Sequence, residues 1–412
     1  MTPETIALLR CPFCGTCLSL VNNTALRQND LLIETGVLGC ECCAFPIVDG
    51  IPVLTSDDRT REALQALEAG HPDDARQLLL ALDPLRADAL SNLMATEHAP
   101  TYRELLSILS VDAESDYFLY RFSDPTYRSA EALLGVVADG ERRPGPALDL
   151  CGGSGHLTRA LMSQSTVADT VLADLFFWKL WLAARITARG CIPICCDANS
   201  PLPFVTEQFA TVVLSDAFPY VWHKRLCATE MMRVARSDAV IMLPHLHSAL
   251  GENVSAGDTL TPAAYENLFS PCAPRLFDDQ HLLDNLLEEQ LVDLTQNLTP
   301  DELGETPSCT LIACTDPMLF ARYRIQESET TQDTLAVNPL YTIDYKDGCS
   351  QLTLEFPTPE YEDEYSATKR YLPARVSVAA DLRGPITDKL IGDRFHELRH
   401  NRVLLDVPRR YC

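Results

Sequence analysis

Short apolar runs recur through the middle of the chain, and four of the first five end in an acidic residue. Runs of this length between glycine-rich or polar segments are typical of strands buried on both faces of a sheet. Segments with helical periodicity separate them. The runs are 147–150, 170–174, 191–197, 211–216 and 238–244, and two later runs, 291–294 and 309–314, have the same character. This alternation predicts an α/β fold with a doubly wound, mostly parallel sheet and a ligand crevice at the carboxyl ends of its strands.

The first run leads into a glycine-rich turn, Cys151-Gly152-Gly153-Ser154-Gly155, and then into a helical pattern. Glycine is needed at such a turn because a side chain would block a ligand from the backbone and from the helix N-terminus. The turn lacks the full G-x-G-x-x-G spacing, which counts against a nicotinamide dinucleotide. Asp174 ends the second run, 25 residues after Asp149, about where a carboxylate meets a ribose diol.

The ordered series resembles the class I S-adenosylmethionine-dependent methyltransferases over about residues 105–316. The resemblance implies a seven-stranded sheet with an antiparallel strand at one edge. Cys151 stands where the family usually has the first glycine of the loop, and its small side chain is expected to be tolerated. The implied cofactor contacts are Asp149, Cys151, Gly153 and Gly155 around the methionine part, Asp174 at the ribose hydroxyls, Leu175 beside the purine, Asp197 and Ala198 at the adenine, and Asp216 near the sulfonium.

Methyl transfer to oxygen or nitrogen needs an electron pair freed of its proton, and a neutral histidine can accept that proton. His245 and His247 follow the fifth run, at the edge where the crevice opens, and His223 is a third candidate. Asp216 is a carboxylate alternative and Tyr220 a hydrogen-bonding one. For each histidine the competing interpretation is an ordinary loop residue or a satisfied polar group in the core.

Cysteines dominate the first 55 residues. Cys11 and Cys14 form one C-x-x-C pair, and Cys40 with Cys43 forms another, which is typical of a closed, structural Cys₄ zinc site. Cys40 with Cys42 is the alternative for the second pair. Together with the segment 45–54, these residues resemble the zinc ribbon of the small tRNA-methyltransferase activator proteins, which in several bacterial methyltransferases is fused in front of the catalytic domain.

Composition narrows the choice of partners. The net charge is −25, with 58 acidic and 33 basic side chains. Nucleic-acid binding depends on cations that neutralise phosphates, so this balance makes nucleic acid an unlikely partner and favours a small-molecule substrate. No apolar run is long enough to span a bilayer, and the start lacks the features of a signal peptide. With 16 cysteines, some adjacent inside an expected strand, the chain suits a reducing cytoplasm. A homo-oligomer is compatible with these features.

Four parts are expected: a zinc ribbon (1–55), a helical linker or cap (56–110), the methyltransferase domain (111–316) and a C-terminal α+β extension of unknown role (317–412). Residues 249–290 are expected to be an insertion that forms the substrate wall. In the extension, 341–356 predicts a hairpin that turns at Asp347-Gly348, and the acidic stretch 360–365 predicts a solvated loop.

The favoured function is S-adenosylmethionine-dependent methyl transfer to an oxygen or nitrogen of a small molecule in biosynthetic or secondary metabolism. One alternative is an RNA or protein methyltransferase that uses the ribbon for recognition. Another is a protein that keeps the methyltransferase fold without catalysing methyl transfer.

Overall fold

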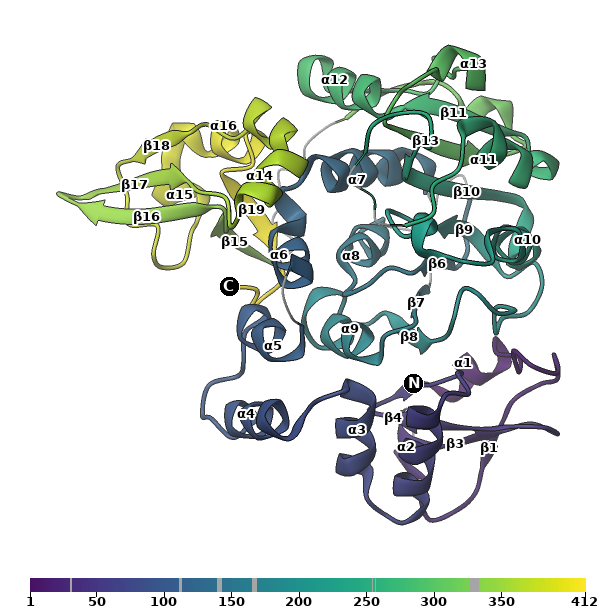
Figure 1. Ribbon diagram of the computed structural model, residues 1–412. Helices are drawn as coiled ribbons and strands as arrows, with labels where there is room; N and C mark the ends of the chain where they lie inside the picture. The colour runs from purple at the N-terminus through teal and green to yellow at the C-terminus, as the bar shows by residue number, and fades with distance from the viewer. Residues whose placement is uncertain are drawn as a thin grey trace.

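The computed structural model describes residues 1–29, 32–110, 113–138, 143–164, 169–253, 255, 257–325 and 333–412. A small cysteine-rich sheet is followed by a helical segment, a large α/β domain and a C-terminal α+β part (Figure 1). Residues 254 and 256 of the expected insertion, and 326–332 of the expected extension, lie outside the described residues.

A seven-stranded sheet with the order β11-β13-β10-β9-β6-β7-β8 forms the centre of the α/β domain. β10, β9, β6, β7 and β8 pair in parallel, and β13 is antiparallel to both of its neighbours. Their bounds are β6 (Ala147–Leu150), β7 (Thr170–Asp174), β8 (Ile192–Cys195), β9 (Phe209–Val213), β10 (Ala235–His247), β11 (Pro274–Asp278) and β13 (Ser308–Ala313). The predicted fold class is confirmed, but the antiparallel strand lies next to the edge strand β11 and not at the edge itself.

The prediction of a sheet strand at Leu291–Leu294 was wrong. β12 (Leu291–Asp293) pairs instead with β14 (Arg322–Arg324) in a separate two-stranded sheet. Its place in the main sheet is taken by β11, which lies inside the expected insertion 249–290, so only part of that stretch is an insertion between sheet strands. β11 escapes sequence inspection because it has only two fully buried residues, Leu276 and Phe277, too few to form a recognisable apolar run.

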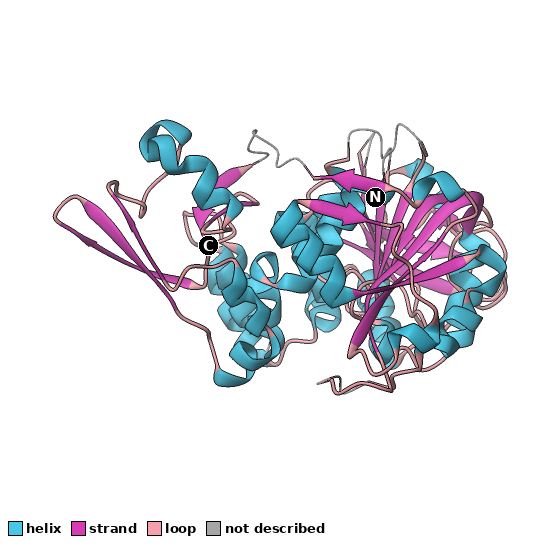
Figure 2. Ribbon diagram, turned by 90° about the horizontal axis from the view of Figure 1, so that it is seen from above, coloured by secondary structure: helices cyan, strands magenta, loops and turns pink. Residues whose placement is uncertain are grey.

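Both faces of the sheet are covered, as Figure 2 shows. Neighbouring residues of a strand point to opposite faces, so each strand contributes to two cores. Val171, Val212 and Ile241 pack on the face that holds α10 and α11. Leu172, Val213 and Met242 pack on the face that holds α7, α8, α9 and α12. The helices of the domain are α6 (Ala113–Tyr120), α7 (Pro125–Val137), α8 (His156–Met162), α9 (Phe177–Leu182), α10 (Lys224–Val234), α11 (Pro262–Leu268), α12 (Asp279–Glu289) and α13 (Pro300–Leu303).

The N-terminal part combines the cysteine-rich sheet with the expected linker helices. Asp57, Asp83 and Thr101 cap α2, α4 and α5 by accepting a backbone N–H of the first turn, which is why these helices begin there. The elements are α1 (Pro3–Ala7), β1 (Ser19–Val21), β2 (Arg27–Gln28), β3 (Ile33–Gly39), β4 (Ala44–Val48), β5 (Ile51–Pro52), α2 (Asp58–Glu68), α3 (Pro72–Leu80), α4 (Pro84–Met94) and α5 (Tyr102–Leu109).

The cysteine-rich sheet is attached to the edge of the main sheet next to β8. Val53 forms a parallel bridge with Cys195, and the Leu54 N–H donates to the Cys195 carbonyl at 2.7 Å. The bonds to Cys195 cover a sheet edge that would otherwise expose unpaired backbone groups. A second attachment lies in the loop between β8 and β9, where the Val205 N–H donates to the Leu8 carbonyl at 3.1 Å.

A single carboxylate ties three parts of the chain together at this junction. Asp49, in the turn between β4 and β5, accepts from Arg76 Nε of α3 at 2.7 Å, from Trp181 Nε1 of α9 at 2.8 Å and from an amino nitrogen of Arg185 at 2.9 Å. The Asp49 side chain is only 12% exposed. Although burial opposes ionisation, the bond to Arg76 and the charge of Arg185 lower the pKa of Asp49.

Replacing Asp49 by asparagine is expected to lower the free energy of unfolding by about 2 kcal/mol, because it removes the carboxylate that Arg185 and Arg76 share and leaves Arg76 only its exposed partner Asp73. Both arginines are partly exposed, which keeps the loss below that of a fully buried pair. Urea denaturation followed by fluorescence measures it. Asp73→Asn is the matched control: Asp73 also pairs with Arg76, at 2.8 Å, but is 79% exposed, and should cost less than about 1 kcal/mol. Equal losses in the two variants would contradict the junction role.

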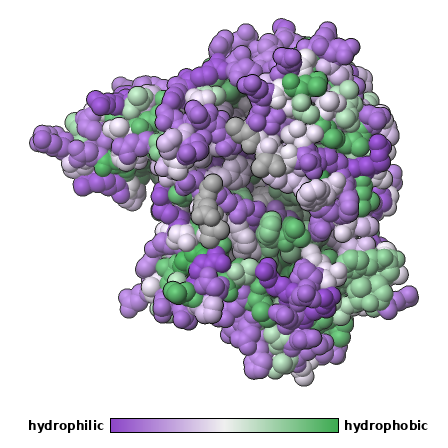
Figure 3. All heavy atoms as spheres, in the orientation of Figure 1, coloured by the Kyte–Doolittle hydropathy of each residue, from purple (hydrophilic) through white to green (hydrophobic). Residues whose placement is uncertain are grey.

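The C-terminal part has its own core and lies beside α6 and α7. The predicted hairpin is present as β16 and β17, and it projects from the molecule with a hydrophilic tip (Figures 1 and 3). The expectation of a solvated loop at 360–365 was right for the exposure of Glu360, Asp363 and Glu364 but wrong for the conformation: the stretch is helical, and Tyr361 and Tyr365 are buried and hold α14 against the domain. The elements are β15 (Thr334–Val337), β16 (Tyr341–Lys346), β17 (Cys349–Leu354), α14 (Pro359–Glu364), β18 (Arg375–Val378), α15 (Asp388–Ile391), α16 (Phe395–His400) and β19 (Leu404–Val407).

Among the described residues, none of the helices combines the length and the apolar character that crossing a bilayer requires.

Candidate functional site

Left-handed backbone marks one edge of the sheet. Cys151 after β6, Asp216 after β9 and His245 near the end of β10 each have φ of 58°. β10 also has a register shift between Leu243 and Leu246. Non-glycine residues rarely adopt this conformation, and such strain concentrates at functional sites. These three strands are neighbours, so the strained residues share the edge at which the sequence places the crevice.

The glycine loop is held by Asp174 and covered by Phe118. The Gly153 N–H donates to Asp174 Oδ2 at 3.0 Å, and the Phe176 N–H donates to Oδ1 at 2.9 Å. Gly153 has φ of 57°, and a Cβ atom there would lie 2.8 Å from Phe118 Cε1. The loop therefore has no room for a side chain at Gly153, and Asp174 sets its position while keeping lone pairs for a ligand.

Asp149 lies beneath the loop with one oxygen unused. Thr158 Oγ1 donates to Asp149 Oδ2 at 2.6 Å, whereas Oδ1 is buried and has no hydrogen-bond partner within the described parts of the chain. Burial raises the pKa of Asp149 to about 7. A buried acceptor without a donor indicates a missing polar partner, and the ammonium of S-adenosylmethionine is a donor of the right kind. The residues at this edge thus fit the cofactor that the sequence predicts.

Asn199 joins the loops after β8 and β9 on the adenine side of the expected site. It donates to Asp197 Oδ1 from its backbone N–H at 2.8 Å and from Nδ2 at 2.9 Å. Its own Oδ1 accepts the backbone N–H groups of Trp222 and His223, and His223 Nδ1 lies 2.8 Å from its carbonyl. His223 is thus engaged in this connection, just ahead of α10. Ala198 is buried beside Asp197.

Two other predicted residues point largely to solvent. Tyr220 is 59% exposed in the loop after β9, and Leu175 is 42% exposed after β7. Both belong to loops at the crevice edge of the sheet.

Arg121 is the residue of this site that motif inspection missed. It is 4% exposed, and it donates to Asp124 Oδ2 at 2.8 Å, to Thr126 Oγ1 at 2.6 Å and to Asp216 Oδ2. Tyr117 Oη also donates to Asp216 Oδ2, at 3.3 Å. Burial works against it, but the charge of Arg121 lowers the pKa of Asp216. A lone arginine inside the aromatic segment 116–127 was the available signal.

His245 and His247 are side by side, and their surroundings shift their pKa values in opposite directions. Their rings are 4.7 Å apart. His245 Nδ1 lies 3.0 Å from Asp279 Oδ2, and Thr310 Oγ1 donates to Asp279 Oδ1 at 2.6 Å. Burial alone would lower the pKa of His245, but the bond to Asp279 and the charge of Asp216 raise it to about 9. Burial and the neighbouring His245 lower the pKa of His247 to about 4.

We expect the two histidines to titrate far apart, near pH 9 for His245 and near pH 4 for His247, in an NMR titration of labelled histidine. Asp279→Asn should bring the His245 transition below pH 7. Since the folded pKa of His245 exceeds its unfolded value of about 6.5, its contribution to stability is complete below pH 6.5 and is lost as the pH rises through about 9. Two coincident transitions near pH 6.5 would contradict this assignment.

The C-terminal part holds α6 against the glycine loop. Tyr411 stacks on Tyr102 of α5, with ring centroids 4.7 Å apart. Its hydroxyl lies 2.8 Å from His156 Nε2 and donates to the Phe118 carbonyl at 2.9 Å. Tyr411 therefore connects the start of α8, directly after the loop, with the helix that carries Phe118.

Four cysteine thiols converge in the N-terminal sheet. The sulfur atoms of Cys11, Cys14, Cys40 and Cys42 all lie within 4.8 Å of one another, and three of the separations are 3.6–3.8 Å. A tetrahedral metal with bonds of about 2.3 Å to sulfur places its ligands about 3.8 Å apart. The group can therefore hold a metal ion.

The fourth member of this group is Cys42 rather than the expected Cys43, which favours the C-x-C alternative for the second pair. The Cys43 backbone N–H instead donates to Cys40 Sγ at 3.3 Å.

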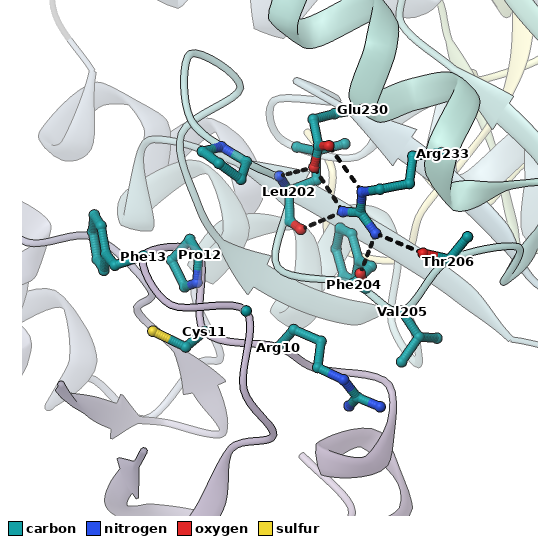
Figure 4. Close-up of a pocket in the computed structure, with 12 residues that line it drawn as sticks. Arg10, Cys11, Pro12, Phe13, Leu202, Phe204, Val205, Thr206, Glu230 and Arg233 are labelled. Atoms are coloured by element: carbon teal, nitrogen blue, oxygen red, sulfur yellow. Dashed lines mark hydrogen bonds and ion pairs between the residues drawn. The ribbon is translucent and has the colours of Figure 1, made fainter. Parts of the chain in front are cut away.

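A groove of about 550 Å³ separates the first cysteine knuckle from the α/β domain (Figure 4). Its polar groups bind one another: Arg233 pairs with Glu230 at 2.6 Å and donates to the carbonyls of Leu202 and Phe204 at 2.9 and 2.8 Å. Glu230 also accepts the Leu202 N–H at 2.7 Å. These bonds hold the loop before β9 in place and satisfy the polar groups of Arg233 and Glu230. The groove therefore marks a contact between two parts of the chain and is not a candidate ligand site.

The strand order, the single reversed strand next to the edge and the glycine loop at the first parallel strand define the class I methyltransferase fold. Solved structures of the same kind are similar to this chain. One is a methyltransferase of Thermotoga maritima described as a possible histamine N-methyltransferase, with 12% identity, 49% of this chain and 94% of that chain covered, and a TM-score of 0.33.

Two further structures are similar at this level. In a complex of the Haloferax volcanii Trm112 methyltransferase activator with a putative methyltransferase, the match has 15% identity, covers 53% of this chain and 99% of that chain, and has a TM-score of 0.35. A methyltransferase of Mesorhizobium loti is 13% identical to this chain. The match covers 46% of this chain and 97% of that chain, with a TM-score of 0.34. No family model and no curated protein matches the chain. At these identities the likeness concerns the fold alone.

Proposed function

We propose that the protein is an S-adenosylmethionine-dependent methyltransferase that acts on an oxygen or nitrogen of a small molecule. The observation that carries the proposal is the cradle at the carboxyl edge of the sheet. There Gly153 has no space for a side chain, Asp174 holds the loop, and Asp149 keeps a buried oxygen without a partner among the described residues. When bound, S-adenosylmethionine supplies an electrophilic methyl group on its sulfonium sulfur.

The residues of the chain would bind the cofactor, exclude water and accept the proton of the substrate. Asp149 would accept the ammonium of the cofactor, Asp174 its ribose hydroxyls and Asp197 its adenine amino group. The helix that carries Phe118 would exclude water from the loop. Of the two neighbouring histidines, His247 is the one that can accept a proton at pH 7, because His245 is held protonated by Asp279.

A small-molecule acceptor is supported by the net charge of −25 and by the cover over the site. α6 packs on the loop and the C-terminal part packs on α6, so the strand ends are not an open surface for a folded RNA. An RNA would also have to overcome repulsion between its phosphates and the acidic protein.

Titration calorimetry of the full chain with S-adenosylhomocysteine tests the cofactor proposal. Wild-type protein is expected to bind, and Asp174→Ala should weaken binding at least tenfold, since a buried charge-assisted hydrogen bond contributes about 1.5–3 kcal/mol. Asp169→Ala, at the other end of β7, is the control and should bind normally. Absence of binding by folded wild-type protein would refute the proposal.

We further propose that the four-cysteine group holds a structural zinc ion. Four thiolates close the coordination shell of zinc, and a sheet of this size has little core of its own. The ribbon would thus be a metal-stabilised cover for the edge at β8.

Metal content separates the two candidate ligands. Purified wild-type protein and Cys43→Ser are expected to carry about one zinc ion per chain, whereas Cys42→Ser should lose most of it. Elemental analysis after dialysis measures the content. Loss of zinc in Cys43→Ser with retention in Cys42→Ser would reverse the assignment.

A further inference from the structure

Several buried polar atoms near the strand ends of β9 and β10 have no hydrogen-bond partner among the residues that the structure describes. They are Ser215 Oγ, Asp216 Oδ1 and His247 Nδ1 on the strand side, and the Tyr361 hydroxyl on α14. Tyr361 is 6% exposed, and its hydroxyl lies in the field of Asp124 and Arg121. Buried polar atoms are normally paired, so their concentration here indicates a polar ligand.

The charges around these atoms do not balance. Asp124 and Asp216 share the one cation Arg121, and Asp279 is matched by His245. Glu364, at the end of α14, adds a further carboxylate that interacts with Asp124 and Asp216. Three carboxylates are therefore paired with two cations in this part of the described structure, and the charge of Glu364 adds to the excess.

The surroundings of Glu364 raise its pKa. Burial is the largest cause, and a hydrogen bond with Tyr365 opposes it; the charges of Asp124 and Asp216 add to the rise, while that of His245 acts in the opposite direction. The direction agrees with the charge excess deduced from the ion pairs.

Aromatic rings complete the surroundings. The rings of Tyr361 and Tyr365 are 4.5 Å apart, and Tyr361 also contacts Tyr120 of α6, with centroids 5.7 Å apart. The Arg121 guanidinium already lies 5.0 Å from the centre of the Tyr117 ring. Faces of aromatic rings together with carboxylates are a common environment for organic cations.

We propose that Asp216, Glu364 and the tyrosines of α14 form the recognition site for the ammonium group of a cationic amine, which is the methyl acceptor; this rests on the proposed methyltransferase function. For transfer, the ammonium would give one N–H proton to neutral His247, which frees the nitrogen lone pair. The methyl carbon would then exchange its bond to sulfur for one to nitrogen, with S-adenosylhomocysteine as the leaving group. The free Oδ1 of Asp216 would accept an N–H of the amine from the strand side, and Glu364 would face it from α14. The C-terminal part would thereby determine which acceptors enter.

An anionic acceptor does not suit the same groups. Both amino nitrogens of Arg121 are occupied, by Asp124 and Asp216, and the side chain is 4% exposed. His245 is paired through Nδ1 with Asp279. The unpartnered Oδ1 of Asp216 can only accept hydrogen bonds, and the hydroxyls of Ser215 and Tyr361 can accept as well as donate, so a ligand that carries N–H donors can pair with all three.

The test uses the full-length protein saturated with S-adenosylhomocysteine and three matched probes: 2-phenylethylamine, 2-phenylethanol and 3-phenylpropanoate. Methylamine and spermidine extend the range of amine size. Calorimetry should show at least one amine binding tenfold or more tightly than the neutral and anionic probes. Glu364→Gln should remove most of that preference and leave the affinity for S-adenosylhomocysteine unchanged.

Asp363→Asn is the matched control, because it removes the same charge from the adjacent residue of α14. Both carboxylates are exposed, but Glu364 is the one that interacts with Asp124 and Asp216. It should keep the amine preference. Equal or tighter binding of the alcohol or the carboxylate, no preference for any amine, or equal effects of the two variants would overturn the inference. If S-adenosylhomocysteine itself fails to bind, it is the proposed methyltransferase function that fails, so the two failures are distinguishable.

Discussion

Gly153→Ala is expected to lower the affinity for S-adenosylhomocysteine about a hundredfold while the protein stays folded. Gly153 has φ of 57°, and an added Cβ would lie 2.8 Å from Phe118 Cε1. A left-handed conformation costs an alanine about 1–2 kcal/mol, and the Phe118 ring would have to move as well. The free loop can relax to avoid this strain, so the strain has to be restored when the cofactor binds. At about 1.4 kcal/mol per factor of ten, the two costs amount to about two orders of magnitude.

Gly135→Ala is the control for this substitution. Gly135 lies inside α7, and nothing lies within 4 Å of the position of its Cβ. Alanine there should stabilise the helix by about 0.5–1 kcal/mol and leave cofactor affinity unchanged. Calorimetry and urea denaturation of both variants measure the two effects. Normal binding by Gly153→Ala would show that this loop is not the cofactor cradle.

The parallel strands could be predicted from sequence because both of their faces are buried. Thr170–Asp174 has five buried residues in succession, and a short uninterrupted run of this kind is typical of a parallel strand covered on both sides. β11 contributes only Leu276 and Phe277 to the core, so it was missed. That omission also concealed Asp279, which follows β11 directly and controls the charge of His245. The position of an acid at a strand end is informative only when the strand itself is recognised.

Arg121 and Glu364 could not be placed from sequence for a different reason. Arg121 meets Asp216 across 95 residues of chain, and Glu364 of the C-terminal part interacts with Asp216 through its charge. No periodicity encodes such contacts, because they depend on how separate units pack. The sequence also could not choose between Cys42 and Cys43, because both spacings from Cys40 are compatible with a metal site. The conformation of the folded turn decides which thiol lies beside the other three.

Replacing Arg121 by methionine is expected to cost about 3–5 kcal/mol of the free energy of unfolding, the largest effect on stability that we expect from a single substitution. Methionine keeps much of the apolar volume but removes the cation that Asp124 and Asp216 share. Both carboxylates would then be buried without a counter-charge, which is far more costly than losing an exposed pair. Urea denaturation at pH 7.5 measures the loss, and Asp216→Asn in the same background should recover part of it.

The pH dependence makes this prediction specific to the ion pair. In the wild type the folded pKa of Asp216 is lowered, so its contribution to stability is present above the unfolded pKa of about 3.9 and is lost as the pH falls through the folded value. Without Arg121 the folded pKa rises above the unfolded one, and the sign reverses: the variant should gain stability relative to wild type between pH 7.5 and pH 5. A stability difference that stays constant over this range would show that Arg121 contributes packing rather than charge.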